Sequence, residues 1–144
     1  MEYEFNLKAY DKELKRMCDV IAIDKYTICV YNKEEDINSG WIKRKDRFVV
    51  LQPTGVKDIK ENESYLGDIL KEHLTEWSSK KDIEHANKCF CIVKKESNSN
   101  NMYLEYNFNI RGYWETNNLS ISKVREYEIV GNIYENPEMI KKED

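Results

Sequence analysis

The stretch KCFCIVKKESNSNNMYLEYNFNI, residues 88–110, has the clearest strand pattern in the chain. Its first part, residues 88–95, is rich in residues that favour strands, and ESNSNN at 96–101 is a short polar loop. In the second part Tyr103 and Glu105 alternate with Leu104, Tyr106 and Phe108. Alternation with a period of two is typical of a strand with one buried face. Two such runs joined by a tight loop predict an antiparallel hairpin.

Shorter runs of the same kind flank this hairpin. Before it we expect a strand over residues 3–10, a hairpin over 17–32, a short strand at 41–42, a strand over 47–51 and another that begins at Gly67. After it we expect short strands at 113–114 and 119–124 and a long strand over 126–134. Residues 32–40 and 54–66 are rich in polar and turn-forming residues and predict loops.

Residues 71–88 allow two interpretations. Leu74 and Trp77 have helical spacing, as do Ile83 and Ala86 more weakly, but a strand with a long polar excursion fits as well. The remaining pattern predicts an all-β fold, or a β-rich α+β fold, of short antiparallel strands. A length of 144 residues predicts one domain over residues 1–144, with residues 1–52 as a candidate N-terminal β subdomain.

Charge and hydropathy exclude several classes of protein. The chain has 23 basic and 27 acidic residues, so it lacks the overall positive charge of a non-specific nucleic-acid binder. No run approaches the roughly 18 apolar residues of a membrane-spanning helix, and we expect no membrane partner. The start, MEYEFNLKAY, lacks the apolar segment of a signal peptide. We therefore expect a cytoplasmic protein whose four cysteines are free thiols.

The stretch YEIVGNIYENPEMI, residues 127–140, predicts an ordered closing element. Gly131 lies inside a predicted strand, where glycine indicates a bulge or a close approach of another backbone. Asn136 and Pro137 then predict a short C-terminal helical turn, because asparagine is a common N-cap and proline is tolerated at the first helical position. The residues that we expect to anchor this element in the core are Ile129, Ile133 and Met139.

Three segments of the chain carry recognisable motifs: residues 4–17, with Tyr10-Asp11 and Met17; residues 51–70, with a Thr-Gly, a Lys-Asp, a Tyr and a Gly-Asp-Ile; and the closing run 128–140. In this order the three segments resemble the YopX-type phage protein family. The motif residues, to which we assign structural roles, are Thr54, Gly55, Asp58, Tyr65, Gly67, Asp68, Gly131, Asn132, Asn136 and Pro137. This chain has Lys60-Glu61-Asn62 where the family has an Asn-Gly turn, and Asn62 suits a positive φ best.

The resemblance implies a fold and an origin, and it implies no activity. The expected fold is a β-barrel of SH3-type topology over residues 53–140. The expected origin is a bacteriophage or a prophage. Because the family has no established activity, the resemblance supports an accessory protein that acts on a host or phage macromolecule, with host takeover or inhibition of a host defence as the preferred purpose.

Catalytic and metal-binding motifs are weak or missing in the sequence. We find no phosphate-binding loop, G-x-S-x-G or H-E-x-x-H, and we therefore expect no enzyme and no cofactor. Cys89 and Cys91 could join His73 and His85 in a zinc site, but their spacing is not that of a zinc knuckle. Cysteine is among the most buried residue types, so we favour core thiols.

Nucleic-acid binding and protein binding are the two functions that remain open. WIKRKDRF, residues 41–48, is the one basic cluster beside aromatic residues, a pattern that small nucleic-acid-binding barrels use. A charged turn explains the same residues, and we favour that interpretation. The residues concerned are Trp41, Lys43, Arg44, Lys45 and Arg47.

Protein binding is the function that we prefer. Exposed aromatic residues make good interface anchors, although core packing explains them too. The aromatic candidates are Tyr103, Tyr106, Tyr113 and Trp114. Edge strands could also pair between copies of the chain and give a homo-oligomer.

Overall fold

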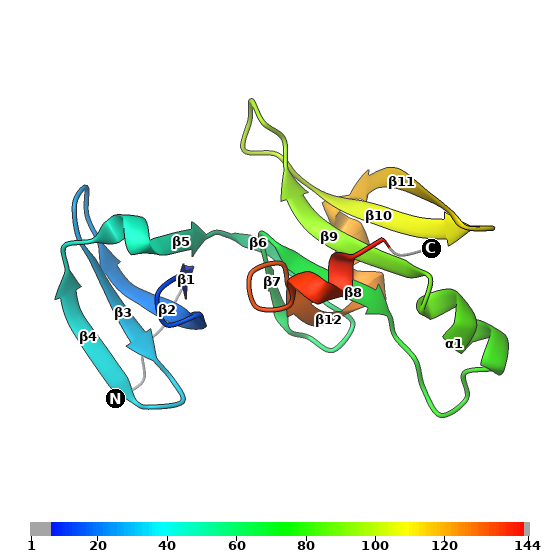
Figure 1. Ribbon diagram of the computed structural model, residues 1–144, viewed down its shortest axis with the longest axis horizontal. Coiled ribbons are helices and arrows are strands. Elements are labelled where there is room, and N and C mark those ends of the chain that lie inside the picture. Colours follow the sequence, from blue (N-terminus) through cyan, green and yellow to red (C-terminus); the bar gives the residue numbers. More distant parts are fainter. Residues whose placement is uncertain (1–6, 143–144) are drawn as a thin grey trace. The chain divides into compact units, whose positions relative to one another are not determined.

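The computed structural model describes residues 7–142 and divides into two compact units, with the boundary after Pro53. Both units consist of antiparallel strands, twelve in the described residues, and the helices are few and short (Figure 1). The prediction of a β-rich fold is confirmed. No helix within residues 7–142 is both long and apolar enough to cross a membrane.

The first unit is a five-stranded sheet with a 3-10 helix before its last strand. Its elements are β1 (Lys8–Asp11), β2 (Arg16–Ile23), β3 (Ile28–Asn32), β4 (Ile37–Ile42), η1 (Lys45–Arg47) and β5 (Phe48–Leu51). The strand order is β4-β3-β2-β1-β5, a four-stranded meander followed by a fifth strand beside the first. Its apolar core contains Ala9, Cys18, Val20, Ile28, Val30 and Phe48.

The second unit has a sheet of the same size, a separate hairpin and three helical segments. Its elements are β6 (Pro53–Lys57), β7 (Glu63–Tyr65), β8 (Asp68–Glu72), α1 (Lys80–Ala86), β9 (Cys89–Lys95), β10 (Met102–Ile110), β11 (Tyr113–Ser120), η2 (Ile121–Glu126), β12 (Tyr127–Asn132) and η3 (Pro137–Ile140). The sheet order is β11-β10-β9-β8-β12, and β6 pairs with β7.

The two units repeat one topology. In each, four strands form a meander, a 3-10 helix follows, and the closing strand pairs antiparallel with the first strand of the sheet. The sequence has no repeat of fixed period, because a strand order requires only suitable alternation and turns, which unlike residues can supply. Within residues 7–142 neither sheet closes on itself, so the closed barrel expected over residues 53–140 is not formed there. The SH3-type classification stays a prediction.

The second sheet is covered on both faces, which explains why its central strand β9 is buried over five successive residues. Residues from β8, β9 and β10 form one face, which is covered by Val56 of β6 and Val124 of η2. On the other face Ile69, Phe90 and Ile92 form a second cluster. The C-terminal segment covers this cluster with Ile133 and Ile140.

Several predicted boundaries were wrong. The predicted loop 32–40 contains most of β4, and the predicted connection 54–66 contains β6 and β7. The predicted strand 119–124 is instead the end of β11 followed by η2, because the Ser120 hydroxyl caps the helix and Val124 is fully buried. Residues 71–88 contain the end of β8 and then α1, so the helical interpretation holds for residues 80–86. In the predicted strand 3–10, Tyr3 and Phe5 lie outside the described residues.

Candidate interaction surfaces

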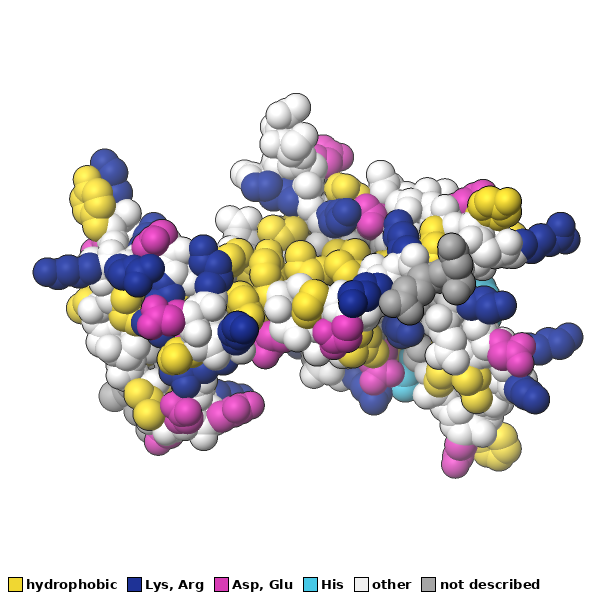
Figure 2. Space-filling model, in the orientation of Figure 1, with side chains coloured by type: hydrophobic (Ala, Val, Ile, Leu, Met, Phe, Trp, Pro, Cys, Tyr) yellow, Lys and Arg dark blue, Asp and Glu magenta, His cyan; other side chains and the backbone are white. Residues whose placement is uncertain are grey.

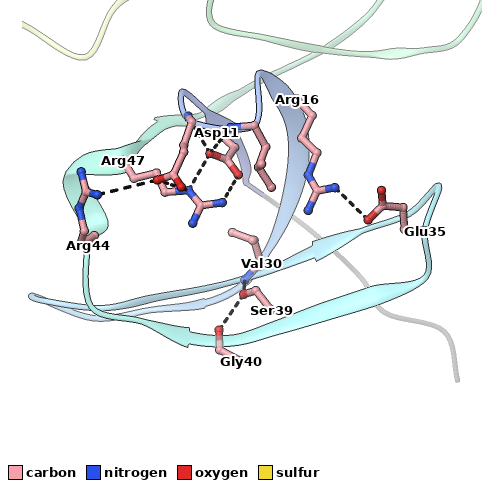
Figure 3. Close-up of polar contacts among 10 residues, drawn as sticks. Asp11, Arg16, Val30, Glu35, Ser39, Gly40, Arg44 and Arg47 are labelled. Atoms are coloured by element: carbon pink, nitrogen blue, oxygen red, sulfur yellow. Dashed lines mark hydrogen bonds and ion pairs between the residues drawn. The ribbon is translucent and has the colours of Figure 1, made fainter.

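The basic segment 41–48 contacts acidic and carbonyl groups of the first unit. Figure 3 shows the contacts of Arg44 and Arg47. Arg44 Nη1 lies 3.8 Å from Glu13 Oε2, and Lys45 Nζ donates a hydrogen bond of 2.9 Å to the carbonyl oxygen of Asp24. Arg44 is also 4.0 Å from Asp46. Trp41, 58% exposed, and Lys43 remain at the surface. The interspersed acids lower the local positive potential that phosphate binding would need.

Arg47 forms an ion pair with the buried Asp11 within the first unit. Arg47 Nε and Nη2 donate to the two carboxylate oxygens at 2.8 and 2.6 Å, a bidentate arrangement (Figure 3). Asp11 is 1% exposed. Burial alone raises the pKa of Asp11, but hydrogen bonds from Arg47 and from the N–H groups of Leu14 and Glu13 outweigh it, so the pKa lies below its ordinary value. Arg47 therefore has a structural role, and nucleic-acid binding by this segment stays a prediction.

The four aromatic candidates do not form one surface. Tyr106 packs among the rings of Phe108 and Tyr127, with centroids at 5.3 and 6.4 Å. Trp114 packs on Phe90, at 5.5 Å, as part of the cluster on the opposite face of the sheet. Tyr103 is half-buried, whereas Tyr113, beside the β10–β11 turn, is 76% exposed. Of the four, Tyr113 alone is largely available to a partner.

Of the four residues considered as zinc ligands, only His85 and Cys89 lie together. His73 Nδ1 lies 3.1 Å from Glu128 Oε2, and Cys91 is buried in the core. His85 Nε2 lies 3.7 Å from Cys89 Sγ and 3.1 Å from Glu72 Oε1. In the described part of the chain, no group of three or more His, Cys, Asp or Glu residues could hold a metal ion.

The same cluster lacks the features of a thiol nucleophile. The thiol of Cys89 and the carboxylate of Glu72 both approach Nε2 of His85. In an activated Cys–His pair, an orienting group binds one imidazole nitrogen and the other nitrogen accepts the thiol proton, so this arrangement is not of that kind. Burial raises the pKa of the Cys89 thiol and raises that of Cys91 to about 12, which keeps both thiols protonated. All four cysteines are free, as predicted, and all four are buried.

The connection between β8 and β9, residues 73–88, is the surface that the sequence did not reveal. We call it the arm. Its side chains include Trp77, which is 87% exposed, together with Leu74 and Ile83, which are also exposed. Figure 2 shows hydrophobic side chains projecting at the lower right, where Figure 1 places α1 and the chain before it. In the first unit the equivalent connection, between β1 and β2, is only residues 12–15.

Local hydrogen bonds give the arm its shape. Ser79 Oγ accepts from the N–H of Asp82 at 3.1 Å, and Asp82 Oδ2 accepts from the N–H of Ser79 at 2.8 Å, which makes a capping box for α1. Before the helix, the N–H of Thr75 donates to Ser78 Oγ at 2.8 Å. Only Ala86 of α1 is buried. The apolar side chains of the arm are therefore presented to solvent by an ordered segment and do not serve the core.

The comparisons with known proteins identify the family. The family model described as YopX protein matches residues 4–141. The chain belongs to the YopX family. A crystal structure of protein EF1440 from Enterococcus faecalis is similar in fold, with a TM-score of 0.51 and 17% identity, over 94% of this chain and 97% of that chain. No curated protein matches this chain.

The YopX motif around residues 54–69 is structural in this chain. Asp58 is buried, and its Oδ1 accepts from the N–H groups of Lys60 and Asn62, at 3.0 and 2.8 Å. Its Oδ2 accepts from the N–H of Ile129 at 2.9 Å, which joins this turn to β12. Glu61, rather than Asn62, has the positive φ of 67°. The prediction for Asn62 was wrong because Asp58 fixes the amides on both sides of Glu61.

The rest of this YopX motif shapes the entry to the second sheet. Thr54 Oγ1 accepts from the N–H of Val56 at 3.0 Å and contacts the Ser64 hydroxyl, and Gly55 follows Thr54. Asp68 Oδ2 accepts from the N–H of the buried Tyr65 at 2.7 Å. Gly67 has a φ of 92°, and a Cβ there would lie 2.9 Å from Tyr134 Cε2. Gly67 is thus required both for its backbone conformation and for close packing.

The YopX closing signature folds the chain back over its last strand. The register of β12 shifts between Ile129 and Gly131, which is a β-bulge at Val130. Asn132 Oδ1 accepts from the N–H groups of Tyr134 and Glu135, at 3.1 and 2.8 Å, and so turns the chain.

Asn136 precedes Pro137 and η3. Contrary to the prediction, the side chain of Asn136 does not cap this helix. Its Oδ1 instead accepts from the N–H of Asn132 at 3.2 Å. Ile129 and Ile133 pack against the two clusters of the second unit, as predicted. The prediction that Met139 is buried was wrong: Met139 is 37% exposed, and Ile140 packs on the core instead.

Proposed function

We propose that this YopX-family chain is a non-catalytic protein-binding module of phage or prophage origin, and that its arm makes the contact. The partner is a host or phage protein in the cytoplasm. The exposure of Trp77 on an ordered segment carries the proposal, because tryptophan is the residue type most enriched among binding hot spots. The strand order of the two units supports an SH3-type scaffold behind this surface.

The length of the arm supports the same conclusion. Long connections in compact domains are usually functional, and the equivalent connection of the first unit shows that the topology does not need one. The raised pKa values of the buried Cys89 and Cys91 thiols argue against nucleophilic catalysis by either of them. Nucleic-acid binding by residues 41–48 ranks second, because Arg47 is committed to Asp11.

Affinity capture during phage growth tests the proposal. The tagged chain and its Trp77→Ala variant are expressed in infected cells, and bound protein and nucleic acid are both quantified. Loss of a hot-spot tryptophan typically weakens binding by about 2 kcal/mol or more, so we expect at least a tenfold loss of the partner. Tyr26→Ala is the matched control, because Tyr26 is a 70% exposed aromatic residue of the first unit.

Two results would contradict the proposal. One is capture of the same protein at equal levels by the wild-type chain and the Trp77→Ala variant. The other is recovery of nucleic acid alone, which would favour the basic segment 41–48.

A further inference from the structure

One edge of the second sheet is formed by an unprotected strand, β11. It pairs with β10 over eight successive residues without a shift in register, and it is the outermost strand on that side of the sheet (Figure 1). Natural proteins usually prevent an edge strand from pairing with another chain by a bulge, a proline, a lysine or a very short strand. β11 is eight residues long and has none of these features, and its only charged residue is Glu115.

The other outer strands of the two five-stranded sheets are protected. β12 contains a bulge, and the turn after β6 covers its edge. In that turn Asp58 Oδ2 accepts from the N–H of Ile129, and the N–H of Ile59 donates to the carbonyl oxygen of Tyr127. In the first unit, β4 has a shift in register and a positive φ of 67° at Gly40, and β5 has only four residues. β11 is therefore the edge that is most open to pairing.

One hydrogen bond shows which backbone groups of β11 point outward. The N–H of Asn109 in β10 donates to the carbonyl oxygen of Lys88 at 2.9 Å, so it points away from β11. Asn109 lies opposite Trp114, and the direction of the backbone groups alternates along a strand. Thr116 and Asn118 therefore direct their N–H and C=O groups away from β10. Within residues 7–142 these four groups have no hydrogen-bond partner.

A second copy of β11 complements this edge. In an antiparallel pair with a two-fold axis at Asn117, Thr116 of each copy lies opposite Asn118 of the other, and these residues exchange four hydrogen bonds. Glu115 then lies opposite Leu119 of the other copy, so the two acidic side chains do not face each other. A strand with a single charge offers little attraction to a charged segment of another protein, whereas it is compatible with itself.

We propose that the chain forms a two-fold dimer in which β11 pairs antiparallel with β11 of a second copy. The pairing joins the two second-unit sheets into one continuous sheet. This surface is separate from the arm, and the dimer does not depend on the function proposed for the arm. Each copy has a net charge of −4, so the copies repel each other at long range and added salt should strengthen the dimer.

Light scattering on the full chain, over a concentration series up to about 1 mM, tests for the dimer. We expect a monomer–dimer equilibrium that shifts toward the dimer as the salt concentration rises. Amide exchange measured by nuclear magnetic resonance then locates the interface. Exchange at Thr116 and Asn118 should slow as the dimer forms, whereas the Asn117 amide, which faces β10, should be protected in both states. A chain that stays monomeric throughout the series overturns the proposal.

Substitutions at exposed positions of β11 separate this pairing from other association. Asn118→Pro removes an outward N–H and leaves the bonds to β10 in place, so it should weaken the dimer at least tenfold. Asn118→Ala is the matched control and should leave the dimer unchanged, because only a side chain is lost. Equal association of a folded Asn118→Pro variant and the wild-type chain contradicts the proposal.

A charge exchange at the two-fold axis gives a second test. Asn117→Lys and Asn117→Asp each place like charges opposite each other and should weaken the dimer, whereas an equal mixture of the two variants should associate more strongly than either alone. A mixture that associates no more than its components overturns the two-fold register. If a variant does not fold, the protection of the Thr116 and Asn118 amides in the wild-type chain decides.

Discussion

Replacing Gly131 by alanine should destabilise the second unit mainly through a clash with the side chain of Asn136, and less through Met139 Sδ at 3.1 Å. A Cβ at this position would lie 2.5 Å from Asn136 Oδ1 and 2.9 Å from Asn136 Cγ. Separations this short do not occur, so the Asn136 side chain must move and give up its hydrogen bond to the N–H of Asn132. Gly131 is not among the glycines with positive φ, so backbone strain contributes nothing.

The expected loss is about 2 kcal/mol of unfolding free energy. Overpacking costs about 1–3 kcal/mol and a lost hydrogen bond about 1 kcal/mol. Alanine restricts the unfolded chain more than glycine does, and this effect restores about 0.4–1 kcal/mol of stability. With a urea dependence of about 1–3 kcal/mol per molar, the midpoint should fall by about 1 M.

Urea unfolding followed by tryptophan fluorescence measures this change. Trp114 packs on Phe90 in the second unit, whereas Trp77 and Trp41 are 87% and 58% exposed, so the signal reports mainly on the second unit. The decisive comparison is a double-mutant cycle with Asn136→Ala, which removes the obstructing amide. The double variant should be no more than a few tenths of a kcal/mol less stable than Asn136→Ala. Full additivity of the two substitutions would refute the reasoning.

Two further predictions concern one carboxylate and one helix cap. Because the pKa of Asp11 is lowered in the folded state, its ionisation stabilises the first unit above the unfolded pKa of about 3.9, and this contribution is lost as the pH falls through the lower folded value. Asp11→Asn should lower stability at pH 7 and flatten this acid dependence, as measured by amide exchange in β1 and β2 from pH 7 downward; an unchanged acid profile would contradict it. Ser79→Ala should lower the stability of α1 by about 1 kcal/mol. Amide exchange in α1 should then be about fivefold faster, while exchange in β9 stays unchanged. Equal acceleration in β9 would mean that the arm and the sheet open together.

The local sequence pattern was sufficient to predict a strand and its pairing where the two paired strands follow each other in the sequence. The hairpin predicted over residues 88–110 is β9 and β10, because alternation and a polar loop specify both strands and their pairing. The pattern failed for β4, in which polar residues and Gly40 occupy an edge strand that buries little. An edge strand needs no apolar alternation, so its sequence resembles that of a loop.

The candidate surfaces could not be predicted, because exposure is a property of the folded chain. The spacing of Leu74 and Trp77 fits a buried helix face as well as an exposed segment, and only the structure places both outside the core. Among the aromatic candidates, Tyr106 and Trp114 are neighbours in a hairpin yet pack in clusters on opposite faces of the sheet. A list of aromatic residues therefore did not define a surface.

By itself, the sequence determined that the chain is β-rich, where its central hairpin lies, and that it belongs to the YopX family. Only the tertiary structure decided that two units share one topology and that Arg47 is paired with Asp11. Alternation acts over a few residues and specifies which side of a strand is buried. The contacts that select partners join Asp11 to Arg47 and Asp58 to Ile129, which are 36 and 71 residues apart, and no local pattern encodes them.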